Sequence, residues 1–334
     1  MKIGMVTACY KPVINGVTRM VDLYQQWLRQ AGHEVTIFTL GEPDVVGDES
    51  NVIRSPAWAV GDTGYYAAAR YTTEAQKRLQ EMDIIHCHHL IMSVEFAHRY
   101  GRAPIIYTNH TRYDLYTAVY TRAVLPFLPE NLIEKAMHTM WPKLTDVCDV
   151  IISPSASVKQ VMRKFGVRRP IRVIENGVDL RPLLNPTHPR CKQTFGLQTE
   201  HVLAVYVGRL SPEKNLPTLL DEFMQAYQQR PELRLLLIGD GPLTNKLKQR
   251  VQTAGLDKAI LFAGAIPYDE VGNYLAAADL FVTASVSEVH PLTVIEAMAA
   301  GLPIAGREAP GVSDSVTAAH SGLLVGEERG ALAQ

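Results

Sequence analysis

Short apolar runs alternate with amphipathic stretches along the first half of the chain. An apolar run at residues 2–8 precedes Thr18–Gln30, where apolar side chains recur at helical spacing. A second apolar run, Val35–Thr39, follows directly. A strand, a helix and a strand in this order indicate a βαβ unit with parallel strands. The same pattern predicts later strands at Ile84–His86, Ile105–Thr108, Val150–Ser153 and Ile171–Ile174, and a helix at Ser157–Phe165.

The alternation lapses after Gly177 and then resumes. Residues 178–200 hold three prolines and show no clear periodicity, which is typical of a domain boundary. A second series then predicts strands at Leu203–Val207, Leu235–Ile238, Ile260–Phe262, Leu280–Thr283, Pro303–Ala305 and Leu323–Val325, and helices at Leu216–Gln229 and from Leu292 onward. We therefore predict two α/β domains, residues 1–177 and 201–334, with a linker at 178–200 and a cleft between the domains.

Composition narrows the class of protein. The 334 residues are 47% hydrophobic and 20% charged with a net charge of −1, as in a soluble globular protein without a nucleic-acid partner. No apolar run approaches the length of a membrane span, and the first residues lack the apolar core of a signal peptide. The four cysteines are far apart, so we expect free thiols in a reducing cytoplasm.

The stretch Leu280–Pro303 reads as a strand, a polar loop and a helix. Glu288 lies in the loop, and Glu296 follows eight positions later on the helix. The first N–H groups of such a helix and its dipole form a site for an anion such as a diphosphate. Two carboxylates beside that anion suit sugar hydroxyls rather than phosphates, because like charges repel. The alternative is an ordinary strand–loop–helix unit with two surface glutamates.

Two cations follow the first strand of the second series. Arg209 and Lys214, in GRLSPEKN, combine a fork-shaped donor with a point charge, which suits a diphosphate. A solvated charged loop is the alternative. The loop IGDGP, whose first glycine is Gly239, would allow a ligand to approach the backbone closely. Gly16, ahead of the first helix, would do the same. Neither a dinucleotide fingerprint nor a Walker motif occurs.

Histidines gather in the first series. His110, in YTNHT, falls at the carboxyl end of a strand, where open parallel sheets bind ligands, although a core or capping histidine remains an alternative. The run His86, Cys87, His88 and His89 resembles a metal cluster. Because alternate strand residues point to opposite faces, at most two of these side chains could act together, and we expect no metal.

Aromatic and basic residues mix between Arg112 and Lys143, where a helical pattern is expected. Such a mixture is typical of a face that lies in a membrane interface. A helix pair that carries its own core would look the same, so both interpretations stay open.

Several motifs together resemble a known family. GRLSPEKN, IGDGP, ENGVD and the two glutamates with seven residues between them occur in the order seen in retaining glycosyltransferases of family GT4. That resemblance implies the GT-B fold, with two Rossmann-like doubly wound domains that face a central cleft. PVINGVT, YTNHT and SPSASV are similar to bacterial glycolipid synthases of the monoglucosyl- and sulfoquinovosyl-diacylglycerol type.

The resemblance implies roles for named residues. Arg209 and Lys214 would hold the donor diphosphate and stabilise the leaving nucleotide, and Gly16 would close over the same phosphates. Glu288 and His110 would lie by the donor sugar. Backbone N–H groups of the run His290, Pro291 and Leu292 would bind the hydroxyls of the donor sugar. Glu296 would accept hydrogen bonds from the ribose hydroxyls, and the backbone of Ile266 would contact the base.

The implied reaction is hexose transfer from a nucleotide-sugar, with UDP-glucose expected, to a membrane lipid such as diacylglycerol. It would need no metal or cofactor, and the protein would be cytoplasmic, with an anionic inner membrane surface as a candidate partner. The alternatives are a transferase for a soluble or polysaccharide acceptor, a nucleotide-sugar epimerase, and a non-catalytic nucleotide-sugar-binding module.

Two departures from the family pattern matter. Val289 and Pro291 stand where many relatives have glycines, which leaves the donor sugar open. The chain also stops at GLLVGEERGALAQ, where relatives continue with helices that brace the two halves. We therefore expect a shortened chain with weaker closure between the domains.

Overall fold

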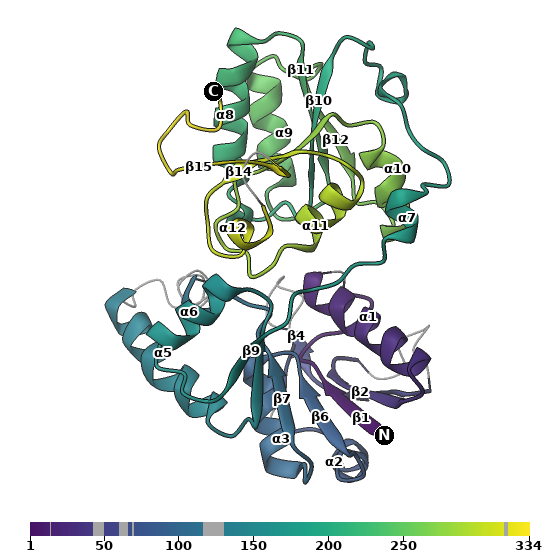
Figure 1. Ribbon diagram of the computed structural model, residues 1–334, viewed down its shortest axis with the longest axis vertical. Coiled ribbons are helices and arrows are strands. Elements are labelled where there is room, and N and C mark those ends of the chain that lie inside the picture. Colours follow the sequence, from purple (N-terminus) through teal and green to yellow (C-terminus); the bar gives the residue numbers. More distant parts are fainter. Residues whose placement is uncertain (14, 43–49, 60–65, 69, 116–129, 317–319) are drawn as a thin grey trace. The chain divides into compact units, whose positions relative to one another are not determined.

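The computed structural model describes residues 1–13, 15–42, 50–59, 66–68, 70–115, 130–316 and 320–334. The chain divides into two compact units, Met1–Asn176 and Gly177–Gln334. Each unit is built on one parallel sheet (Figure 1).

The first unit holds a seven-stranded sheet in the order β3-β2-β1-β6-β7-β8-β9, and every pair of neighbours is parallel. Its strands are β1 (Lys2–Val6), β2 (Glu34–Leu40), β3 (Val52–Ser55), β6 (Ile84–Cys87), β7 (Ile105–Thr108), β8 (Val150–Ser153) and β9 (Ile171–Val173). Its described helices are α1 (Gly16–Gln30), α2 (Thr73–Leu79), α3 (Glu95–Tyr100), α5 (Glu130–Thr145) and α6 (Ala156–Lys164), with a wide turn η2 (Leu90–Val94) before α3. A two-residue pairing joins β4 (Trp58–Ala59) to β5 (Tyr66–Ala67).

Both faces of the first sheet are buried. Met5 and Ile37 lie in one apolar cluster with Val17 and Val21 of α1. Their strand neighbours, such as Val6 and Phe38, lie in a second cluster with residues of α2, α3, α5 and α6. Because successive strand residues point to opposite faces, this division places helices on both sides of the sheet.

The second unit holds a six-stranded parallel sheet in the order β12-β11-β10-β13-β14-β15. Its strands are β10 (Val202–Val207), β11 (Leu233–Ile238), β12 (Ile260–Gly264), β13 (Leu280–Thr283), β14 (Ile304–Arg307) and β15 (Gly322–Val325). Its helices are α7 (Arg181–Leu184), α8 (Leu216–Gln229), α9 (Thr244–Thr253), α10 (Val271–Leu275), α11 (Leu292–Ala299) and α12 (Val312–Ser315), with 3₁₀ turns η3 (Lys192–Phe195), η4 (Pro212–Lys214) and η5 (Tyr268–Glu270).

Helices again cover both faces of the second sheet. Leu203 and Val205 share a cluster with side chains of α7, α10, α11 and α12. Ala204 and Tyr206 share the opposite cluster with α8 and α9, which Figure 1 shows side by side. The predicted fold class, two Rossmann-like doubly wound sheets, is confirmed.

The predicted strands all exist, most with ends shifted by one or two residues, and β7, β8, β13 and α8 have the predicted bounds. The segment expected to be a linker, 178–200, lies within the second unit. It forms α7 and η3, and Leu183 and Leu197 are buried in that unit's core. Pro182 lies in the first turn of α7, where proline is tolerated, and the two buried leucines pack the segment against the core.

The aromatic segment 112–143 is described only in part, because residues 116–129 lie outside the described residues. Tyr113 packs edge-on against the fully buried Trp141, with ring centroids 5.7 Å apart. Arg112 is 6% exposed and forms an ion pair with Asp114 at 2.7 Å. These three side chains, Tyr113, Trp141 and Arg112, therefore serve the core rather than a membrane face. None of the helices in the described parts of the chain has the length and hydropathy of a membrane span.

Candidate active site

The order in which the chain adds strands to the second sheet reverses between β10 and β13. From β10 the chain continues to β11 and β12 on one side, and from β13 it continues to β14 and β15 on the other. Ligands of open parallel sheets bind at the carboxyl ends of the strands where this reversal occurs. The loops that carry Arg209 and Lys214 after β10, and Glu288 after β13, both lie at this point.

Lys214 and Glu288 contact each other directly. Nζ of Lys214 lies 2.7 Å from Oε1 of Glu288, and their side chains are only 21% and 16% exposed. The Ser285 hydroxyl donates to the same carboxylate oxygen at 2.7 Å. Burial raises the pKa of Glu288, but the Lys214 ammonium and the Ser285 hydroxyl outweigh burial and hold the pKa below its usual value. Glu288 is therefore a charged carboxylate, and the interpretation as a surface glutamate is wrong.

Further hydrogen bonds fix the two loops to each other. The Ser287 hydroxyl donates to the backbone oxygen of Glu213 at 2.7 Å. The side-chain amide of Asn215 donates to the backbone oxygen of Ala284 at 3.1 Å. Because each bond joins the loop after β10 to the loop after β13, Lys214 and Glu288 are held at a set separation.

Helix α11 begins beside Glu288. Pro291 precedes its first residue, Leu292, and has no N–H and no side-chain oxygen that could cap the first turn. Of the run His290, Pro291 and Leu292, only the first and last residues can therefore donate backbone hydrogen bonds. Glu296 lies in the second turn and is 3% exposed, so it also is not a surface glutamate.

Glycines allow the loops around these groups to pack closely. A Cβ at Gly239, whose φ is +135°, would lie 1.9 Å from the backbone oxygen of Gly208, and one at Gly241 would lie 2.5 Å from that of Leu210. A Cβ at Gly311 would lie 2.5 Å from the backbone oxygen of Glu288. The IGDGP glycines thus let this loop pack against the loop that carries Arg209, whereas the sequence had indicated only access for a ligand.

Arg209 and Ile266 complete the predicted set in this unit. Arg209 follows β10, and its backbone oxygen accepts from the Tyr206 hydroxyl at 3.3 Å. Ile266 follows β12 and packs partly buried against the core. Both therefore lie beyond carboxyl ends of the same sheet, as Gly239 does beyond β11.

In the first unit, Gly16 is the first residue of α1. Asn15 caps this helix: its side-chain oxygen accepts from the backbone N–H of Thr18 at 2.9 Å. A Cβ at Gly16 would meet no atom within 4 Å among the described residues. The described protein therefore leaves open space at the position that was expected to approach a ligand.

Four imidazoles gather at the carboxyl ends of β6 and β7. Nδ1 of His88 lies 3.0 Å from Nε2 of His110, and Nε2 of His86 lies 2.6 Å from the Thr108 hydroxyl. Nδ1 of His89 accepts from the backbone N–H of Ala8 at 3.1 Å. Across the described ranges, no three His, Cys, Asp or Glu side chains are grouped as metal ligands.

Burial keeps these imidazoles uncharged. It lowers the pKa of His86 and of His89 to about 4 each. Burial, with smaller effects of His89 and His86, lowers the pKa of His110 to about 3, and burial together with the other three imidazoles lowers that of His88 well below its usual range. At neutral pH the cluster can orient polar groups but brings no positive charge.

The structure brings Lys214 and Glu288 into contact and aligns the other second-unit candidates along one sheet edge. Sequence reasoning missed the supporting residues Ser285, Ser287 and Asn215, although the run Ser285-Val286-Ser287 is a signal that could have indicated them. It also treated His88 only as a possible metal ligand and missed its contact with His110.

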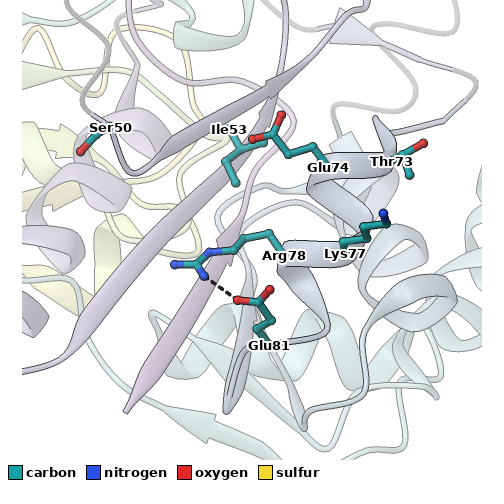
Figure 2. Close-up of a pocket in the computed structure, with 7 residues that line it drawn as sticks. All are labelled: Ser50, Ile53, Thr73, Glu74, Lys77, Arg78 and Glu81. Atoms are coloured by element: carbon teal, nitrogen blue, oxygen red, sulfur yellow. Dashed lines mark hydrogen bonds and ion pairs between the residues drawn. The ribbon is translucent and has the colours of Figure 1, made fainter.

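A separate groove of about 590 Å³ lies on the first unit (Figure 2). It is lined by Ser50, Ile53, Thr73, Glu74, Lys77, Arg78 and Glu81. Arg78 forms ion pairs with Glu81 and with Glu34, the first residue of β2. The groove thus lies toward the amino end of this strand, away from the histidines, and its opposite charges balance.

Comparison with solved structures defines the class of protein. The structure of Anabaena Alr3699/HepE in complex with UDP matches with a TM-score of 0.74 at 19% identity, covering 100% of this chain and 88% of that chain. The structure of WaaG, a glycosyltransferase involved in lipopolysaccharide biosynthesis, matches with a TM-score of 0.71 at 16% identity, covering 99% and 90%. The chain has the fold of GT-B glycosyltransferases.

Family models identify the chain more closely. The model for Glycosyltransferase Family 4 matches residues 14–181, and the model for group 1 glycosyl transferases matches residues 189–333. The chain belongs to glycosyltransferase family 4, as the motifs predicted, and it is an enzyme of this type.

Three relatives align with more than nine-tenths of this chain. The alpha-monoglucosyldiacylglycerol synthase of Acholeplasma laidlawii is 28% identical over 324 residues, covering 91% of this chain and 79% of the relative. The enzyme of the same name from Streptococcus pneumoniae is 29% identical over 340 residues, covering 97% and 75%. The sulfoquinovosyl transferase SQD2 of Arabidopsis thaliana is 26% identical, covering 91% and 58%.

Proposed function

We propose that this glycosyltransferase moves glucose from UDP-glucose to diacylglycerol at a membrane surface, with retention of the anomeric configuration. The observation that carries the donor half is the Lys214–Glu288 contact at the point where the second sheet reverses. The acceptor half is supported by the two glucosyldiacylglycerol synthases, whose similarity covers more than nine-tenths of this chain.

The donor diphosphate would bind Lys214 and Arg209 at the amino end of α11. A diphosphate offers oxygens that satisfy an ammonium, a guanidinium and the first N–H groups of a helix together. Lys214 lies 2.7 Å from Glu288, so its positive charge is already fixed in place by a carboxylate before a donor binds. An ammonium held in this way pays little rotamer entropy when the diphosphate arrives.

Glu288 would accept hydrogen bonds from the donor sugar and Glu296 from the ribose. A charged carboxylate accepts strongly from hydroxyl groups, and the lowered pKa of Glu288 keeps it ionised at neutral pH. Glu296 is almost fully buried on α11, which suits a contact with an enclosed ribose. His290 and Leu292 would bind sugar hydroxyls through backbone N–H groups, Ile266 and Gly239 would line the nucleoside side, and His110 and Gly16 would act from the first unit.

The reaction needs no covalent intermediate on the protein. The bond between C1 of glucose and the β-phosphate oxygen breaks while the acceptor hydroxyl forms a bond to C1. The acceptor proton passes to the departing phosphate on the same face of the sugar, which retains the configuration. Lys214 and Arg209 would stabilise the negative charge that develops on UDP.

The test is transfer of radiolabelled glucose from UDP-glucose to vesicles that contain diacylglycerol and an anionic lipid. Extraction into organic solvent should carry label only when diacylglycerol is present, and the product should show the α-anomer by NMR. Label that stays in water while UDP is released would contradict the lipid acceptor and favour a soluble or polysaccharide one. Tight UDP binding without release of UDP from UDP-glucose would contradict this donor.

A further inference from the structure

His88 is a buried imidazole whose contact with His110 has no part in the proposed function so far. Its Nδ1 lies 3.0 Å from Nε2 of His110, and the two rings are nearly parallel, at 13°. His88 is 1% exposed, whereas His110 is only partly buried. Of these two rings, His110 is therefore the one that is accessible to a ligand.

The contact requires one proton between two nitrogen atoms. Burial keeps both rings neutral at pH 7, as described above, so each carries a single N–H. Either His88 donates from Nδ1 to Nε2 of His110, or His110 donates from Nε2 to Nδ1 of His88. The other nitrogen of each ring, Nε2 of His88 and Nδ1 of His110, is therefore protonated in one arrangement and unprotonated in the other.

The far nitrogen of His88 favours one arrangement. Its Nε2 is buried and makes no hydrogen bond to any residue that the structure describes. If His110 were the donor, this Nε2 would carry a buried N–H without an acceptor, which costs about 1–3 kcal/mol. If His88 is the donor, Nε2 keeps only an unused lone pair, and buried acceptors without partners are tolerated better than buried donors. A free imidazole weakly prefers the Nε2–H tautomer, but this preference does not remove the cost of a buried N–H without an acceptor on His88.

We propose that His88 is a positioning residue that donates to His110 and holds it as the Nδ1–H tautomer. His110 then presents a hydrogen-bond donor at Nδ1, for which no acceptor occurs in the described parts of the chain. This role rests on the proposed function, in which His110 faces the donor sugar. Nδ1–H would donate to a sugar hydroxyl oxygen, and His110 would not act as a base toward the acceptor.

Nitrogen-15 NMR of the whole chain with ring-labelled histidine tests the tautomer without any substrate. His110→Gln identifies the His110 signals by their loss. In the unmodified protein at pH 7, His110 should show a protonated Nδ1 and an unprotonated Nε2. A protonated Nε2 on His110 would overturn the proposal, whatever the donor and acceptor prove to be.

Two substitutions of His88 separate positioning from packing. Asn places an amide N–H near the position of Nδ1, so His88→Asn should keep the His110 tautomer and most of the turnover. Leu fills space without a donor, so His88→Leu should shift His110 toward Nε2–H and lower kcat about 10-fold or more, as loss of a partner that orients a histidine does at other sites. The KM for UDP-glucose should change far less.

His98→Leu, at an exposed position on α3, is the matched control and should leave turnover unchanged. Equal losses of turnover in His88→Asn and His88→Leu would mean a packing role and contradict the proposal. If transfer is absent in every variant, the proposed function fails, while the NMR result still decides the role of His88.

Discussion

In the first unit, the groups beyond β6 and β7 are imidazoles that burial keeps neutral. In the second unit, Lys214 and Glu288 form an ion pair at 2.7 Å beyond β10 and β13, and the ammonium helps to hold the pKa of the carboxylate below its usual value. Both sheets put these groups at their carboxyl ends, so the fold alone does not set the electrostatics. Burial and local partners do: burial without an opposite charge keeps the imidazoles neutral, whereas a neighbouring ammonium outweighs burial and keeps the Glu288 carboxylate charged.

This contrast suggests a division of labour. Buried neutral donors and acceptors can orient hydroxyl groups without attracting anions, whereas paired charges can bind a diphosphate. We therefore expect changes in the second unit to affect nucleotide binding and charge stabilisation. Changes in the first unit should affect the orientation of the sugar and the stability of the protein in acid.

The largest effect should come from Lys214→Ala. It removes a cation from the proposed diphosphate site. The Glu288 carboxylate, which is 16% exposed, then loses its ion pair and keeps the hydrogen bond from the Ser285 hydroxyl. We expect kcat/KM for UDP-glucose to fall about 10²–10³-fold, the usual cost of one donor that stabilises developing charge. The measurement is initial-rate kinetics of lipid labelling.

Lys248→Ala is the matched control for Lys214→Ala. Lys248 is an exposed cation on α9, and its ammonium lies 5.7 Å from the centre of the Phe262 ring. Its loss should leave kcat/KM within about two-fold, as is usual for exposed charges. Similar losses in both variants would mean that overall charge, and not the site at the sheet reversal, controls the rate.

Glu288→Ala should lower turnover by about 10²-fold while the affinity for UDP changes little. The carboxylate is proposed to contact the sugar, and UDP lacks the sugar. Removing Glu288 also leaves Lys214 without this partner, so UDP can even bind more tightly. Measurement of kcat and of the Kd for UDP on the same variant checks this. A large loss of UDP affinity would mean that Glu288 contacts the nucleotide and not the sugar.

Acid should destabilise the first unit before the second. The pKa values of His86, His89 and His110 are lowered to about 4, 4 and 3 in the folded protein, so the unfolded chain binds protons first as the pH falls below about 6.5. Their contribution to stability is thus complete above pH 6.5 and is lost as the pH falls toward these values. Each histidine contributes a slope of about 1.4 kcal/mol per pH unit in this window. Glu288, whose pKa is lowered, loses its contribution only below its usual value of 4.5.

Tryptophan fluorescence isolates the first unit, because all three tryptophans, Trp27, Trp58 and Trp141, lie in it. The urea midpoint followed by fluorescence should fall between pH 6.5 and pH 5. The midpoint of the circular dichroism transition that does not coincide with the fluorescence change should fall less over the same range. His86→Asn removes one of these groups and should flatten the dependence. A midpoint that does not change over this range would contradict the neutral cluster.

The smallest effect should be that of a chelator. Lys214 and Arg209 are proposed to do the work that a divalent cation does in other transferases. Transfer should therefore stay within about two-fold in excess EDTA, because the proposed charges belong to the protein itself. Loss of activity in EDTA that Mg²⁺ or Mn²⁺ restores would contradict this role.

The sequence predicted the parts of the fold that depend on local pattern. Buried parallel strands such as β8 and β13 are continuous apolar runs, and the pattern therefore gave their bounds. It did not predict the short helices α2 and α10, whose seven and five residues carry too few repeats for a periodic signal. It also assigned 178–200 to a linker, because prolines hide the two buried leucines that pack on the second core.

The candidate site was predictable where chemistry follows from residue type. Glu288, Lys214 and Arg209 stand in recognisable motifs, but their motifs do not reveal that Lys214 and Glu288, 74 positions apart, make contact. The same limit applies to His88 and His110, which are 22 positions apart and follow the neighbouring strands β6 and β7. Such contacts depend on strand order and register, which a single sequence does not specify.

The most direct test of the proposed division is the affinity for UDP, measured by calorimetry on five forms of the chain. Lys214→Ala and Glu296→Ala in the second unit should each weaken UDP binding about 10-fold or more, the cost of losing a charge-assisted hydrogen bond. His88→Leu and His110→Leu in the first unit should bind UDP as the unmodified chain does. UDP affinity that falls with the histidine substitutions and not with Lys214→Ala and Glu296→Ala would contradict the account.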